Sequence, residues 1–381
     1  MGILAKACYA RVTSLADRDL ECGMASRRLF TSLRIRGVEF TNRVWVSPMC
    51  QYSATDGVIG DWHLAHLGSF ATGGVGLIMV EATGVMPSGR ISIGCAGIWN
   101  EEQGEAFKPV IRFAHKQSVK IGIQLAHAGR KGSTMRPWDD HPFATLAEGG
   151  WETIAPSAIP FGDYPTPHAL TLDEIKDVED HFVDAAIRAE RVGFDLVEIH
   201  AAHGYLIHQF LSPLSNKRSD HYGGSFENRT RLLLEIATRI RASIKESTPL
   251  FVRISATDWM DSGWNLEESI ELAKALKEVG VDLIDVSSGG LVHNSKLKTG
   301  PGYQVPFASA IKDGASILTA AVGQITEAEQ AEEIIASGKS DAVMLGRAML
   351  RNPRWALTAA EALGAYIDMP TQLDRARQIT K

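Results

Sequence analysis

The chain has 381 residues, of which 45% are hydrophobic and 22% are charged, as in ordinary globular proteins rather than disordered or collagen-like ones. Its 39 Lys and Arg residues against 45 Asp and Glu residues give a net charge of −6, which argues against a nucleic-acid partner. No apolar run reaches the roughly 18 residues of a membrane span. No two of the four cysteines have the C-x-x-C spacing of a metal or redox motif, so iron–sulfur clusters are not expected, and a chain this long can bury a core without a disulfide scaffold.

The N-terminal segment differs from the rest of the chain. It mixes small, basic and acidic residues without a clear period, and it has no continuous apolar segment of a secretory signal. Asp17, Asp19 and Glu21 lie close together, although transit peptides are poor in acidic residues. We therefore expect residues 1–27 to be a disordered extension, residues 28–381 to form one domain with a C-terminal tail, and the protein to be cytoplasmic.

From residue 43 onward, short apolar or β-branched runs alternate with amphipathic segments. Near-continuous apolar runs are typical of strands that are buried on both faces of a parallel sheet. Eight strands are predicted on this basis, at residues 43–48, 75–82, 120–126, 194–200, 250–255, 281–287, 317–322 and 341–346.

The segments between these strands have helical patterns. The clearest begins at Thr171, where Thr171 and Glu174 have the spacing of a capping box ahead of a periodic run to Arg191. Gly193 and Gly280 stand just before predicted strands, as is typical of a helix C-terminus. The other predicted helices are at residues 101–118, 226–244, 265–279, 326–337 and 347–363.

Eight strand–helix units in about 320 residues predict an α/β fold, a (β/α)8 TIM barrel. An open, doubly wound sheet is the competing architecture. Gly74 and Gly76 resemble the start of its dinucleotide motif, but they precede a strand, and Met79 replaces the last glycine. Three long connections leave the C-terminal ends of strands, where barrel enzymes keep their active sites, at residues 83–99, 127–170 and 288–304.

Polar residues are predicted at this same end of the barrel. Gln124 and Arg253 lie within apolar strand runs, where burial is unfavourable without a partner, so they indicate a polar ligand. Gly323 and Gly346 end the last two strands, where barrels commonly bind a phosphate through backbone N–H groups. Arg347 would add a charge-assisted hydrogen bond to such a phosphate.

His200 ends the fourth predicted strand and His203 follows it, with H-x-x-H spacing. A zinc site would need a third ligand, and no paired cysteines or H-E-x-x-H motif are nearby, so we predict no metal. A structural histidine pair is a second interpretation. We favour a third, in which both imidazoles donate hydrogen bonds to a ligand oxygen and polarise its carbonyl group. Tyr205 is either an aromatic residue at a helix start or a proton donor to carbon.

Four segments are distinctive: SPMCQYS (47–53), IQLAHAGRK (123–131), VEIHAAHGYLIHQFLSPLSNKRSDHYGGSFENR (197–229) and LGRAMLRNP (345–353). They resemble the Old Yellow Enzyme family of FMN-dependent ene-reductases, and most closely its bacterial, thermophilic-like branch of NADPH dehydrogenases and xenobiotic reductases. The resemblance runs from about residue 29 to about residue 375. It implies a tight, non-covalent FMN at the top of the barrel.

The resemblance also implies how the flavin is held. Gln124 would hydrogen-bond its pyrimidine part, and Ala82 would pack near the isoalloxazine ring. Arg253 would lie near N1 and O2, where a fixed cation favours the anionic hydroquinone. Cys50 would modulate the flavin potential rather than act as a nucleophile. The remaining implied FMN contacts are Ser47, Pro48, Met49, Gly323, Gly346 and Arg347.

The implied reaction is the reduction of an activated alkene. NADPH, or alternatively NADH, would reduce the flavin, which then transfers hydride to the β-carbon of an α,β-unsaturated ketone, aldehyde or imide, or of a nitroalkene. His200 and His203 would bind the substrate oxygen, and Tyr205 would protonate the α-carbon. Tyr52 would contact the substrate.

The branch also commonly assembles as a homodimer or homotetramer in which a C-terminal arginine reaches the neighbouring active site. Arg375 stands at that place, although Leu373 replaces the tyrosine that commonly precedes it. Two alternatives remain open. A 2,4-dienoyl-CoA-type reductase barrel is disfavoured by the missing cysteine cluster, and a flavin-free barrel lyase is disfavoured because Lys120 lies at the wrong end of its strand.

Overall fold

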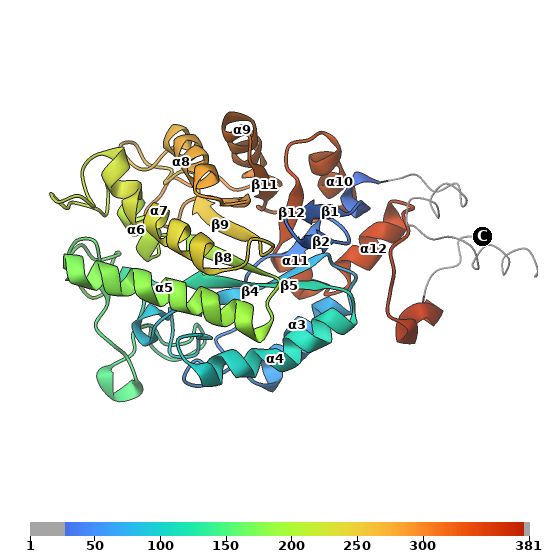
Figure 1. The fold of residues 1–381 in the computed structure, drawn as a ribbon, viewed down its shortest axis with the longest axis horizontal. Helices are drawn as coiled ribbons and strands as arrows, with labels where there is room; N and C mark the ends of the chain where they lie inside the picture. The colour runs from blue at the N-terminus through green and yellow to red at the C-terminus, as the bar shows by residue number, and fades with distance from the viewer. Residues whose placement is uncertain (1–26, 377–381) are drawn as a thin grey trace, which may run out of the picture.

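A closed barrel of eight parallel strands forms the centre of the computed structural model, which describes residues 27–376 (Figure 1). Around the barrel the strands follow one another in chain order, and the last pairs with the first. They are β3 (Val44–Val46), β4 (Leu77–Gly84), β5 (Lys120–Ala126), β8 (Leu196–Ala201), β9 (Leu250–Ser255), β10 (Leu283–Ser287), β11 (Leu318–Ala321) and β12 (Ala342–Leu345). The predicted (β/α)8 fold is confirmed. The predicted extension lies, apart from Arg27, outside the described residues.

Helices follow the strands and pack around the outside of the barrel. In Figure 1, α3, α4 and α5 lie side by side along one flank. None of the helices in residues 27–376 is long and apolar enough to cross a membrane. The helices are α3 (Asp61–Ala71), α4 (Glu101–Lys116), α5 (Leu172–Val192), α6 (Leu206–Leu211), α7 (Phe226–Ser243), α8 (Leu266–Glu278), α9 (Val305–Ala315), α10 (Ala328–Ala336), α11 (Arg347–Arg351) and α12 (Trp355–Ala362).

Local sequence signals set the ends of several helices. At the start of α5, the Thr171 side chain accepts a hydrogen bond from the Glu174 N–H, and the Glu174 carboxylate accepts one from the Thr171 N–H, which confirms the capping box. The prediction of one helix over 347–363 is wrong. The chain forms α11 and α12 instead, because Pro353 has no N–H to continue the helix. Helices α3, α6 and α9 are absent from the predicted set.

A short hairpin closes the N-terminal end of the barrel, and the sequence patterns did not predict it. Strands β1 (Leu33–Ile35) and β2 (Val38–Phe40) pair antiparallel. The Phe40 ring packs against Trp45, with ring centroids 4.8 Å apart, and against Phe251 at 6.5 Å. The hairpin thereby completes a cluster of apolar side chains that fills this end of the barrel, here called the apolar plug. It is made of Ile35, Phe40, Trp45, Leu77, Met79, Leu196, Phe251, Leu283, Ala320, Ala342 and Met344. Because this end is filled, a ligand can enter the barrel only from the opposite end.

The connections at that opposite end are long, as predicted. The segment after β4 contains a 3-10 turn, η3 (Pro87–Gly89). The segment after β5 contains two further 3-10 turns, η4 (Gly129–Lys131) and η5 (Leu146–Glu148), and a pair of two-residue strands, β6 (Ile154–Ala155) and β7 (His168–Ala169). These segments form the walls of the site described next.

Candidate active site

A layer of polar side chains lies inside the barrel directly above the apolar plug. Gln124, Glu198, Arg253 and Asp285 come from four neighbouring strands, β5, β8, β9 and β10, and the last three each stand two positions beyond an apolar residue of the plug. Successive side chains of a strand alternate between faces, so these positions also point inward. Gln124 Nε2 donates a hydrogen bond to Glu198 Oε1 over 2.8 Å. Arg253 Nε lies 3.1 Å from Asp285 Oδ2, and Arg253 Nη1 donates to the Ser47 hydroxyl over 3.2 Å.

This layer carries two buried carboxyl groups and one guanidinium. Burial, reinforced by the charge of Asp285, raises the pKa of Glu198 to about 8, so Glu198 holds a proton at neutral pH. Burial also raises the pKa of Asp285, although Arg253 opposes that effect. One oxygen of Glu198 and both oxygens of Asp285 have no hydrogen-bond partner within residues 27–376. The layer therefore has spare polar atoms that are buried beneath the mouth of the barrel.

Replacing Glu198 by Gln is expected to flatten the pH dependence of stability. The folded protein keeps a proton that the unfolded chain loses near its ordinary pKa of 4.5, so stability falls as the pH rises from about 4.5 to about 8. A glutamine side chain does not titrate, and its carbonyl oxygen still accepts from Gln124. Urea unfolding midpoints between about pH 5 and about pH 8 measure the effect, with E278Q at an exposed position as the control. Parallel curves for wild type and E198Q would contradict the prediction.

Two histidines and a tyrosine gather at the mouth of the barrel. His200 is the penultimate residue of β8, and its ring centroid lies 5.1 Å from that of His203 and 5.1 Å from that of Tyr205, with both pairs near perpendicular. The chain turns sharply between the last two residues, because His203 has φ +57° and Gly204 has φ +74°. The structure thus brings together the three residues that were predicted as catalytic.

Their surroundings fix their protonation. Nδ1 of His200 accepts from the Ala202 N–H over 3.3 Å, which leaves the ring proton on Nε2. Nε2 of His203 lies 2.7 Å from the Ser287 hydroxyl. Burial, followed by the charge of Arg253, lowers the pKa of both histidines well below 6.5, so both imidazoles are neutral and each carries one ring N–H. Burial raises the pKa of Tyr205 well above 10, so the phenol keeps its proton.

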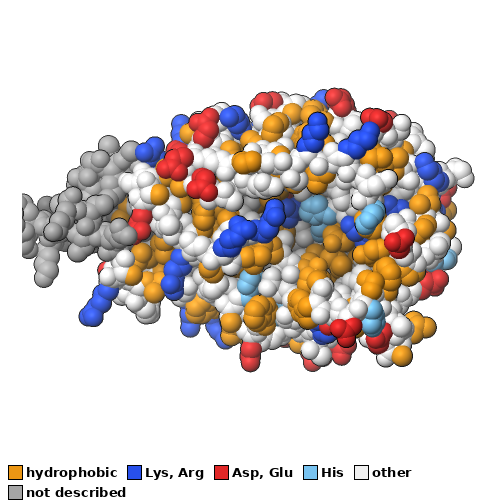
Figure 2. All heavy atoms as spheres, turned by 180° about the vertical axis from the view of Figure 1, so that it is seen from behind, with side chains coloured by type: hydrophobic (Ala, Val, Ile, Leu, Met, Phe, Trp, Pro, Cys, Tyr) orange, Lys and Arg blue, Asp and Glu red, His pale blue; other side chains and the backbone are white. Residues whose placement is uncertain are grey.

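Two cavities adjoin this cluster. One, of about 380 Å³, is lined by three predicted phosphate contacts, Gly323, Gly346 and Arg347, together with Arg351. The other, of about 570 Å³, is lined by Tyr52, Lys131, Phe161, Tyr164 and Tyr205, among others. Figure 2 shows a hollow near the middle of one face of the molecule, with basic side chains and histidines beside it.

The first predicted strand supplies the other expected flavin contacts. Ser47 is buried and accepts from Arg253, while Pro48, Met49 and Cys50 are half-buried. Met49 Sδ lies next to Gly346, 3.6 Å from where a side chain there would begin. A thiol–thiol interaction with Cys95, together with burial, raises the pKa of Cys50 well above 9, which suits a thiol that is not a nucleophile. Ala82 is buried, and its backbone contacts this thiol.

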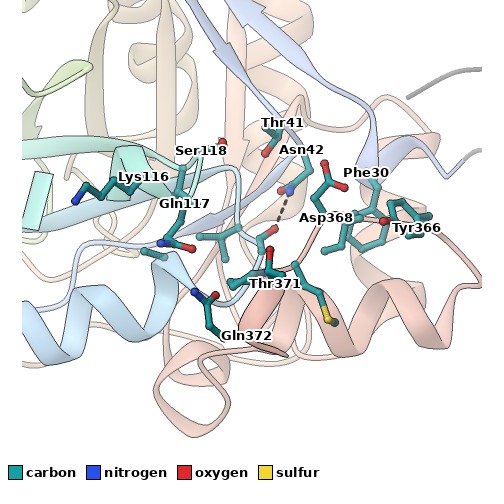
Figure 3. Close-up of a pocket in the computed structure, with 17 residues that line it drawn as sticks. Phe30, Thr41, Asn42, Lys116, Gln117, Ser118, Tyr366, Asp368, Thr371 and Gln372 are labelled. Atoms are coloured by element: carbon teal, nitrogen blue, oxygen red, sulfur yellow. Dashed lines mark hydrogen bonds between the residues drawn. The ribbon is translucent and has the colours of Figure 1, made fainter. Parts of the chain in front are cut away.

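Arg375 is not near these side chains. It is exposed on η6 (Thr371–Ala376) at the end of the described chain. Thr371 and Gln372 of this turn line a separate cavity of about 370 Å³ with Asn42, which comes just before β3 (Figure 3). Asn42 Nδ2 donates to Gly74 O over 2.8 Å, and its Oδ1 accepts from the N–H of Val44, the first residue of β3. That cavity holds none of the predicted site residues.

Lys131 belongs to the site, and the sequence analysis assigned it no role. Its ammonium donates to the carbonyl oxygens of His203 over 2.9 Å and of Gly290 over 3.0 Å. It also lies 4.4 Å from the ring centroid of Phe161 and 5.2 Å from that of Tyr205. Burial lowers its pKa to about 8. Its position in the IQLAHAGRK segment was the available signal, because that segment follows a predicted strand at the active-site end.

Within residues 27–376, no group of three or more His, Cys, Asp or Glu residues is arranged to hold a metal ion.

The sequence model of the NADH:flavin oxidoreductase / NADH oxidase family matches residues 28–365. The chain belongs to this family. It is 48% identical over 368 residues to an NADH:flavin oxidoreductase of Gibberella zeae, covering 92% of this chain and 89% of the relative. It is 46% identical over 353 residues to the NADPH dehydrogenase of Bacillus subtilis, covering 92% of this chain and 99% of the relative. The old yellow enzyme homologue from Zymomonas mobilis superimposes with a TM-score of 0.72 and 28% identity, covering 90% of this chain and 94% of that one.

Membership in the family confirms several predictions. The protein is an FMN-dependent oxidoreductase of the Old Yellow Enzyme type that uses a nicotinamide nucleotide as hydride donor. The flavin-free lyase alternative is thereby excluded. Family membership does not decide between a dienoyl-CoA and another alkene as the substrate. Both would react in the second half-reaction, in which the substrate reoxidises the reduced flavin.

Proposed function

We propose that this flavin oxidoreductase is an ene-reductase, which reduces the C=C bond of an α,β-unsaturated ketone, aldehyde or imide, or of a nitroalkene. The observation that carries this proposal is the cluster of His200, His203 and Tyr205. It places two neutral imidazoles beside one protonated phenol, with the His200 ring centroid 5.1 Å from those of His203 and Tyr205. Imidazole N–H groups suit an electron-withdrawing oxygen, and the phenol suits the proton that an alkene needs besides a hydride.

The residues beside this cluster fit FMN. Gly323 and Gly346 leave room for a phosphate, and a side chain at Gly323 would meet Tyr303 and Gln304 at about 3.1 Å. Arg347 and Arg351 line the same cavity and supply positive charge. The unpartnered polar atoms of the buried layer suit the polar edge of an isoalloxazine ring. We infer that Gln124 and Arg253 of this layer, with Ser47 to Cys50 and Ala82, hold that ring.

The protein side chains then prepare the alkene. His200 and His203 donate hydrogen bonds to the substrate oxygen, and this draws electron density away from the β-carbon. Bound FMN supplies the hydride that the β-carbon accepts. Tyr205 gives its proton to the α-carbon, and the ammonium of Lys131 stabilises the phenolate that remains. Tyr52 lines the same cavity and contacts the substrate.

We also propose a homodimer or homotetramer in which Arg375 of one protomer reaches the substrate cavity of its neighbour. In one chain Arg375 is exposed and belongs to the turn that lines the cavity of Figure 3, with residues that come before the barrel. Its distance from the histidines of its own chain supports an approach to the site of a second protomer.

An anaerobic absorbance titration of the purified holoenzyme tests the proposed function. The yellow protein is expected to bleach with NADPH and to recolour fully when 2-cyclohexen-1-one is added without oxygen. Saturated cyclohexanone serves as the matched control, because it offers the same carbonyl oxygen without an alkene. Bleached protein that recolours only with oxygen would overturn the alkene substrate class.

A further inference from the structure

The turn that joins His203 to Tyr205 is held by side chains from outside the catalytic cluster. His203 and Gly204 have left-handed backbone conformations, with φ +57° and +74°. A side chain at Gly204 would begin 2.2 Å from Gly290 O, so the two loops pack backbone against backbone. Such a conformation persists only where its surroundings enforce it.

Both peptide groups of Gly204 are bound by residues of α6. The Gly204 N–H donates to Nδ1 of His208 over 2.9 Å, and the Gly204 carbonyl accepts from Nε2 of Gln209 over 2.7 Å. Both side chains are fully buried. The first of these bonds requires that Nδ1 of His208 carries no proton, so the ring proton sits on Nε2.

Asp258 faces that proton from the loop after β9. Its Oδ1 lies 3.0 Å from His208 Nε2 in a bent contact, and neither atom has another hydrogen-bond partner within residues 27–376. Its Oδ2 accepts from the Ser212 hydroxyl over 2.6 Å and from the Trp264 N–H over 2.8 Å. Asp258 is fully buried, and although burial alone raises its pKa, the contacts with His208, Ser212 and Trp264 lower it overall. The Asp258 carboxylate is therefore the group that faces the ring proton of His208.

We propose that Asp258 and His208 are positioning residues that hold the His203–Tyr205 turn in its reactive geometry. Asp258 selects the His208 tautomer whose Nδ1 is free, and that nitrogen fixes the Gly204 N–H between the carbonyl-binding histidine and the proton-donating tyrosine. The kinetic consequence rests on the proposed ene-reductase function. The tautomer assignment does not, because it follows from the Gly204–His208–Asp258 contacts alone.

The substitution D258N tests the pair without changing side-chain volume. The amide oxygen can replace Oδ2 as acceptor from Ser212 and Trp264, which turns the NH2 group toward His208 Nε2. The ring proton then moves to Nδ1, where it opposes the Gly204 N–H. We expect reoxidation of the reduced enzyme by 2-cyclohexen-1-one to slow by about 10- to 100-fold, because small misplacements of reacting groups have effects of this size. Bleaching of the flavin by NADPH should slow much less, since it needs no proton from Tyr205.

Two control variants separate tautomer selection from general loss of packing. S212A removes another hydrogen bond to Asp258 and should leave both half-reactions near wild type. In H208N, the amide oxygen accepts from the Gly204 N–H, and an amide has no imidazole tautomers that residue 258 could select. Reoxidation by the enone should therefore be faster in the double variant H208N/D258N than in D258N. A double variant as slow as D258N, or slower, would overturn the proposal.

If D258N does not fold, a second pair of variants tests the positioning role of His208. H208N and H208L both leave Asp258 without its imidazole partner, but only H208N keeps an acceptor for the Gly204 N–H. The asparagine variant should retain reoxidation by the enone, and the leucine variant should lose it. Equal rates in the two variants would overturn the positioning role.

Side-chain ¹⁵N NMR of histidine-labelled holoenzyme gives a readout that does not depend on the substrate. The His208 signal, assigned by its absence in H208N, should show protonated Nε2 in wild type and protonated Nδ1 in D258N. The same tautomer in both would overturn the inference even if turnover changes. If the tautomer changes as expected but the enzyme does not reduce enones, the positioning role of Asp258 and His208 is supported and only the proposed ene-reductase function is refuted.

Discussion

Replacing Tyr205 by Phe is expected to slow reoxidation of the reduced enzyme by an enone by about 10²–10⁴-fold, the range that general acid catalysis contributes. The substitution removes one oxygen and keeps the ring, which packs 5.1 Å from His200. Bleaching of the flavin by NADPH should stay close to wild type, because that half-reaction needs no proton from the phenol. Anaerobic stopped-flow absorbance measures the two half-reactions separately.

The matched control is Y222F, which removes a phenol oxygen that is bonded to Glu235 away from the site. Because burial raises the pKa of Tyr205 well above 10, wild-type reoxidation should show no decline from ionisation of this phenol below about pH 10. Reoxidation of Y205F at the wild-type rate would assign the proton to water or to another group. An equal loss in both half-reactions would mean that Tyr205 binds rather than donates.

The polar layer of the barrel shows how far the sequence predicts the site. A polar or charged residue inside an apolar strand run indicates a buried functional position, and this argument identified Gln124 and Arg253. The same argument applies to Glu198 and Asp285, which the sequence analysis left out. Each stands two residues beyond an apolar plug residue, in register with the other interior positions. The alternation of inward and outward side chains along each strand therefore also predicts Glu198 and Asp285 as interior residues.

Other features depend on contacts between distant segments. Lys131 reaches the carbonyl of Gly290, 159 residues further along the chain, and no local pattern encodes that approach. The β1–β2 hairpin has strands of three residues each, too short for a clear alternation, and it becomes stable by packing Phe40 into the barrel. Local periodicity therefore predicts the barrel strands well, whereas the plug and the loop contacts follow from how the barrel closes.

Replacing Arg253 by Met is expected to destabilise the fold by about 3–5 kcal/mol, the range measured when one partner of a buried ion pair is removed. Arg253 is the only cation in contact with Asp285 in the described part of the chain, and both side chains are nearly inaccessible to solvent. Its loss leaves a carboxylate without compensation beside Glu198, whose pKa is already raised by burial and by that same carboxylate. Urea unfolding of the FMN-free proteins measures the loss without a contribution from weakened cofactor binding.

The double variant R253M/D285N separates charge from packing. If the loss comes mainly from the unpaired carboxylate, the neutral amide at position 285 should restore part of the stability, and the double variant should be more stable than R253M. Two losses that simply add would show that packing by the long arginine side chain, rather than the ion pair, stabilises the layer. A coupled result would mean that the cation proposed to face the flavin is held in place by a carboxylate beneath it. In that case D285N alone should loosen Arg253 and weaken FMN binding.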